Sequence, residues 1–96
     1  MSSTTVPASL VATTIALSND SRIKTSIDFL DLQMNWDNLS DDVQEAKVKK
    51  LLDDLNENMS CVNTIISNSN LSPEPFKNTL DLIGMQYIAI CTFAYV

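Results

Sequence analysis

The sequence predicts an all-α fold: an antiparallel up-and-down bundle of three or four helices, forming a single domain over residues 1–96. Apolar residues recur at alternating steps of three and four in three separate stretches, the spacing that places side chains on one face of a helix. The chain has one Gly and three Pro, too few for the many turns of a β-sandwich or barrel. Short connections between the later stretches favour antiparallel neighbours.

Residues 1–19, which precede those three stretches, carry no charged side chain. Residues 7–17 contain enough aliphatic side chains for a short fourth helix, although threonine lowers the helix propensity of this segment. The segment is interpreted either as that short helix or as an arm that binds a partner. No Lys or Arg precedes its apolar part, so a secretory signal peptide is not expected.

A helix is predicted to follow, with Asn19 or Asp20 as its N-cap and its end near residues 35–38. Phe29 lies beside its apolar positions, and steps of four, three and four connect the residues expected to form its buried face: Ile23, Ile27, Leu30 and Met34.

The middle of the chain predicts the longest helix. Ser40 is a suitable N-cap, and Asp41 and Asp42 place negative charge in the first turn, where it complements the helix dipole. The polar residues 67–70 mark its end. Its expected buried face is broadened by Leu51 and Ile65 and consists of Val48, Leu52, Leu55, Met59, Val62 and Ile66.

The C-terminal stretch predicts another helix, with Ser72 as the cap and Pro73 at the first helical position. Beyond Gly84 this helix is apolar on nearly every side, so it must be enclosed by other helices or inserted into an apolar environment. The β-branched and aromatic content of residues 87–96 also suits a buried strand, which stays the alternative. The expected buried positions are Phe76, Leu80, Ile83, Tyr87, Ile90 and Ala94.

The composition argues against catalysis, and no catalytic, metal or cofactor site is predicted. The chain has no histidine, the commonest general base and zinc ligand, and its single Gly excludes a phosphate-binding loop. The pattern Asp-Asp-x-x-Glu occurs at residues 41–45 and 53–57, but it is interpreted as a solvated face in which Lys49 and Lys50 pair with acids four residues away. Cys61 and Cys91 leave both a disulfide and two free thiols open.

Charge also limits the partners. The formal net charge is −6 and the isoelectric point is about 4.2, so binding to nucleic acid is not expected. We expect an intracellular, cytoplasmic protein because so few cysteines do not form a disulfide scaffold. The four Asn-x-Ser triplets, at Asn19, Asn38, Asn58 and Asn70, are accordingly expected to be unglycosylated.

These observations predict a non-enzymatic assembly subunit that binds a protein partner or further copies of itself. The apolar C-terminal helix is the expected contact, and the residues expected at the interface are Trp36, Ile83, Tyr87, Ile90 and Phe93. The alternative is a lipid-associated protein in which residues 82–96, or the neutral N-terminal stretch, contact a bilayer or enclose an acyl chain.

Overall fold

The computed structural model describes residues 5–95 of the chain, with side chains from residue 8 onward. This range folds into three α-helices, α1 (Thr5–Asn35), α2 (Asp41–Asn68) and α3 (Lys77–Tyr95), joined through two short 3₁₀ turns, η2 (Trp36–Asn38) and η3 (Glu74–Phe76). The described residues contain no strand, so the predicted all-α class is confirmed. The strand alternative is wrong as far as Tyr95.

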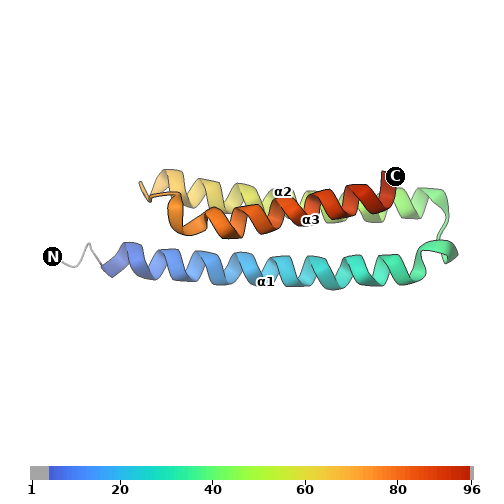
Figure 1. Cartoon of the computed structure of the whole chain (residues 1–96), viewed down its shortest axis with the longest axis horizontal. Coiled ribbons are helices and arrows are strands. Elements are labelled where there is room, and N and C mark those ends of the chain that lie inside the picture. Colours follow the sequence, from blue (N-terminus) through green and yellow to red (C-terminus); the bar gives the residue numbers. More distant parts are fainter. Residues whose placement is uncertain (1–4, 96) are drawn as a thin grey trace.

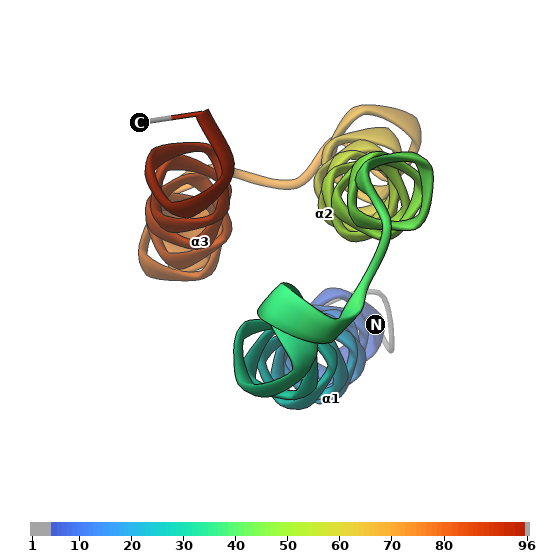
Figure 2. The same ribbon diagram turned by 90° about the vertical axis from the view of Figure 1, so that its right-hand side faces the viewer.

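The helices lie side by side along one axis. In Figure 1, α2 runs back along α1, and α3 then runs back along α2. Seen along that axis, the three helices occupy the corners of a triangle, so each helix has two neighbours (Figure 2). The Cα positions extend 58 × 18 × 18 Å. A core can therefore form only along the central line where all three helices meet.

Helix α1 is continuous through residues 17–21, where the sequence predicts a boundary. The predicted N-cap at Asn19 or Asp20 is therefore wrong, and residues 7–17 are not a separate helix. No Pro or Gly interrupts this region, and each Ser, Asn or Asp inside a helix costs only about 0.5 kcal/mol. Hydrogen bonds between Ser18 and α2 help to offset that cost. The C-terminal end at Asn35 agrees with the prediction.

Both boundaries of α2 follow the predicted local signals. The Ser40 hydroxyl accepts a hydrogen bond from the Val43 amide at 3.4 Å, as expected of an N-cap. Helix α2 ends at Asn68, and Asn70 then adopts a positive φ of 49°, a conformation that Asn tolerates better than most residues.

The predicted start of the C-terminal helix, with Ser72 as cap and Pro73 at the first helical position, differs from the structure: Pro73 precedes a 3₁₀ turn, and α3 begins only at Lys77. The Ser72 hydroxyl accepts a hydrogen bond from the Glu74 amide of that turn at 3.4 Å.

The core combines residues from all three helices. The faces predicted for α2 and α3 supply most of it, and the partly buried side chains packed against it include Leu52, Met59, Leu80 and Tyr87. Its buried members are Leu32, Val48, Leu51, Leu55, Ile83 and Ile90. Val62 and Phe76 are buried closer to the connection between α2 and α3. These positions show that α2 and α3 pack with the faces that their sequences predict.

The predicted buried face of α1 is wrong. Ile23, Ile27, Leu30 and Met34 are 52%, 62%, 58% and 75% exposed. Leu32 is buried instead, and the buried polar residues Thr14, Ser18 and Thr25 continue the inward face toward the N-terminus. The inward face offers aromatic packing near its C-terminal end and hydrogen bonding near Ser18, interactions that the aliphatic face lacks.

Candidate functional site

The five residues expected at an interface lie in or around the chain's own core. Ile83 and Ile90 are 0% and 1% exposed, so neither has surface left for a partner while the bundle is closed. Tyr87 is half-buried and packs against the core from α3. Trp36 and Phe93 are also half-buried. The contact of these residues with another chain stays a prediction.

Trp36 and Phe93 are brought together by the fold. The Trp36 ring meets the Phe93 ring edge to face, with centroids 4.8 Å apart and an interplanar angle of 71°. Phe29 packs on the same Phe93 ring at 5.6 Å and 78°. Such pairs contribute about 0.5–1.5 kcal/mol beyond the area they bury. This aromatic group therefore holds the C-terminal end of α1 against α3.

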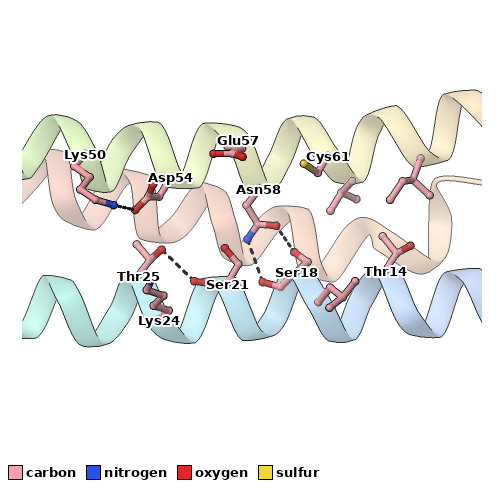
Figure 3. Close-up of a pocket in the computed structure, with 13 residues that line it drawn as sticks. Thr14, Ser18, Ser21, Lys24, Thr25, Lys50, Asp54, Glu57, Asn58 and Cys61 are labelled. Atoms are coloured by element: carbon pink, nitrogen blue, oxygen red, sulfur yellow. Dashed lines mark hydrogen bonds and ion pairs between the residues drawn. The ribbon is translucent and has the colours of Figure 1, made fainter.

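A groove of about 470 Å³ lies between α1 and α2 (Figure 3). Its lining is mixed, and small hydroxyl side chains of α1 face the side chains of α2 across it. The α1 side is formed by Thr14, Leu17, Ser18, Ser21, Lys24 and Thr25, and the α2 side by Lys50, Asp54, Glu57, Asn58, Cys61, Val62 and Ile65. The groove thus presents hydrogen-bonding groups as well as apolar ones.

Ser18 and Asn58 form a buried polar pair on the floor of this groove. The Ser18 hydroxyl donates to Asn58 Oδ1 at 2.7 Å, and Asn58 Nδ2 donates to the Ser18 carbonyl oxygen at 3.1 Å (Figure 3). Both residues are buried, at 4% and 7% exposure. Because a buried polar group without a partner is costly, each residue makes the other acceptable at this depth.

Charged side chains lie at one end of the groove. Lys50 Nζ pairs with Asp54 Oδ2 at 3.0 Å, and this hydrogen bond and the carboxylate charge raise the pKa of Lys50. Lys49 pairs in the same way with Asp53 at 2.7 Å, which raises the pKa of Lys49. Both ammonium groups remain protonated at neutral pH. Lys49 and Asp53 are the more exposed pair, as the prediction of a solvated helix face requires.

The polar residues of the groove were missed by the sequence reasoning because it followed apolar positions only. Val48, Leu51, Leu55, Asn58 and Val62 are separated by steps of three, four, three and four, and all five are buried. Asn58 is therefore the single polar member of an otherwise apolar row. A polar side chain at such a position is a recognisable signal for a specific contact between helices.

The acidic motifs and the cysteines are not gathered into one cluster in the part of the chain that the structure describes. Within residues 5–95, no group of three or more Cys, Asp or Glu side chains is arranged to hold a metal ion. Cys61 is exposed, Cys91 is half-buried, and both are free thiols.

The outward side of α1 carries a continuous apolar surface, which we call the α1 stripe and define as Ile23, Ile27, Leu30 and Met34. Each member lies two positions from a buried residue of the same helix, Thr25 or Leu32. Two positions correspond to about 200° of rotation, so the α1 stripe points directly away from the core.

Exposed apolar side chains also occur on α3, namely Met85, Ile88 and Tyr95. Within the described residues, no helix combines the length and apolar character required to cross a bilayer.

Comparisons of the chain with protein-family models, with curated proteins and with solved structures gave no match.

Proposed function

We propose that this chain is a non-enzymatic helical assembly subunit of the cytoplasm, an up-and-down bundle of three helices that binds another protein chain through the α1 stripe. The observation that carries the proposal is the exposure of all four α1-stripe residues, each more than half accessible to solvent. Contiguous apolar surface of this kind is typical of sites of protein contact.

The packing of the other residues supports the choice of α1. Helices α2 and α3 bury their main apolar faces inside the bundle, including Ile83 and Ile90. The α1 stripe has no such role, because Leu32 supplies α1's buried contribution to the core. The stripe is therefore available for binding without any opening of the fold. The contact between Trp36 and Phe93, on the inward side of the bundle, packs the end of α1 against α3 and so keeps the stripe facing outward.

The proposal predicts that association and folding can be separated by mutation. The double variant Ile27→Ser, Leu30→Ser should keep the helix content and thermal stability of the monomer, because both side chains are exposed. It should lose association, because two of the four apolar contacts become polar. Light scattering after size exclusion, with circular dichroism on the same fractions, measures both properties for the chain alone and with any protein that co-purifies.

A matched control is Ile88→Ser, which changes an equally exposed apolar residue on α3. Wild-type protein and this control should associate alike. Undiminished association of the double variant would contradict the proposal, as would a wild-type chain that stays monomeric and binds no other protein.

A further inference from the structure

We propose that the occupant of the α1 stripe is a second copy of this chain, bound with its α1 antiparallel to the first and related to it by a two-fold axis between Asp28 and Phe29. This inference rests on the proposed function and names the partner. It follows from the order of residues along the stripe and from the charges beside it.

The α1 stripe is self-complementary when one helix is reversed. If residue n of one copy lies level with residue 57 − n of the other, Ile23 faces Met34 and Ile27 faces Leu30. The two-fold axis repeats both contacts, which gives four apolar layers over a rise of about 16 Å. All eight side chains are accessible before association.

Charge complementarity selects this orientation. Lys24 and Asp31 lie along the same edge of the α1 stripe, the edge on the side of α1 that faces α2. A two-fold axis keeps this side of the two copies together, and Lys24 of one copy comes within about 3 Å of axial rise of Asp31 in the other. The ion pairs found within residues 8–95 involve neither residue. Asp31 Oδ1 accepts a hydrogen bond from the neutral Asn35 amide at 3.2 Å, which leaves the carboxylate charge uncompensated. In a parallel pair, Lys24 would instead approach Asn19.

Acidic residues restrict the register. Asp20 precedes the stripe by three positions, and Asp37 follows it by three. Sliding the helices by seven residues would place one of these carboxylates against Ile27 or Leu30, which would bury a charge without a partner. In the proposed register, Asp20 of one copy lies level with Asp37 of the other at each end of the contact, where both side chains are exposed and solvent screens the repulsion between the two carboxylates. An acidic residue therefore lies beyond each end of the four apolar layers and limits how far the two helices can slide.

The contact is small. A stable interface buries about 800 Å² on each partner, more than four partly exposed side chains provide. We therefore expect a dimer that dissociates at about micromolar concentrations, which sedimentation equilibrium from about 1 µM to about 500 µM would resolve.

Charge reversal tests the pairing. Lys24→Glu should weaken the dimer about tenfold, because two attractive pairs become repulsive, and Asp31→Lys should do the same. The double variant should recover most of the wild-type affinity, because the opposite charges face one another again. Monomer helix content serves as the control for folding. Weakening in the double variant equal to the combined effect of the singles would overturn the pairing.

Disulfide trapping tests the orientation. In a background with Cys61→Ser and Cys91→Ser, an Ile23→Cys chain should cross-link under mild oxidation to a Met34→Cys chain. It should not cross-link to itself, because the two Ile23 positions lie about 16 Å apart in the antiparallel pair, beyond the roughly 7 Å that a disulfide spans. Cross-linking of Ile23→Cys to itself would overturn the antiparallel arrangement.

Failure of this inference is distinguishable from failure of the proposed function. A wild-type chain that is monomeric at every concentration overturns self-association. If the variant Ile27→Ser, Leu30→Ser nevertheless releases a different protein that the wild type binds, the proposed function stands and only the identity of the partner changes. If neither self-association nor another protein contact depends on the stripe, both proposals are overturned.

Discussion

At the scale of the residue, Asn58 has a larger structural role than its polarity suggests. It occupies a core position between Leu55 and Val62 on α2 and exchanges two hydrogen bonds with Ser18 of α1. Sliding α1 against α2 by one turn would separate the pair and leave buried polar atoms without partners. We therefore interpret the pair as the contact that sets the register of α1 on α2, a role documented for polar residues at helix interfaces.

A double-mutant cycle tests this interpretation. Asn58→Ala should lower the free energy of unfolding by about 1–3 kcal/mol, because it removes the acceptor of the buried Ser18 hydroxyl. Ser18→Ala should cost about 1 kcal/mol. The double variant should lose less stability than the sum of the two single losses, because removing both side chains leaves no buried partner unsatisfied. Urea denaturation followed by circular dichroism measures all four corners of the cycle, and additive effects would show that the two side chains are not coupled.

At the scale of the element, the sequence predicts α2 and α3 better than α1. Each of those two helices has one broad apolar face, and that face is the one that packs. Helix α1 has two: the α1 stripe, and a second set at Phe29, Leu32 and Trp36 with steps of three and four. Spacing alone could not choose between them. The choice depends on tertiary contacts, chiefly the Phe93 ring, which lies more than 50 residues away in the sequence.

The same limit applies to the candidate site. Thr14 and Ser18 precede the helix start predicted at Asn19 or Asp20, and Thr25 lies opposite the predicted apolar face, so apolar spacing alone did not reveal the α1 side of the groove. Once Leu32 is placed inward, helical spacing brings these residues inward as well.

Two aspartate substitutions on α1 distinguish its faces. Leu32→Asp should destabilise the bundle by more than about 3 kcal/mol, because it buries an unpaired charge in the core. Ile27→Asp should change monomer stability by less than about 0.5 kcal/mol, because its side chain is exposed. Chemical denaturation at low protein concentration, below any dimerisation, measures the difference. The opposite order of stabilities would mean that α1 packs through the stripe after all.

At the scale of the whole molecule, the interior differs between the two ends of the bundle. Toward the connection between α1 and α2, the buried residues of α1 and α2 are apolar: Leu32, Val48, Leu51 and Leu55. Toward the connection between α2 and α3, Thr14, Ser18 and Asn58 enter the interior beside Val62 and Phe76. Hydrophobic burial is the dominant stabilising contribution, whereas a buried hydrogen bond adds only about 1 kcal/mol net. The end with the polar interior should therefore open more easily.

Hydrogen exchange monitored by mass spectrometry tests this difference within a single helix. Amides of residues 14–21 in α1 should exchange about tenfold faster than those of residues 28–35, although both segments are helical and the first begins more than two turns after Thr5. Simple fraying from the N-terminus would give a gradient along residues 8–21 that Asn58→Ala leaves unchanged. If the polar interior controls opening, Asn58→Ala should instead accelerate the exchange of residues 14–21 and leave the exchange of residues 28–35 unchanged. Equal protection of both segments would mean that α1 opens only together with the whole bundle. The buried polar pair would then hold its part of α1 in place as strongly as the aromatic contacts hold theirs.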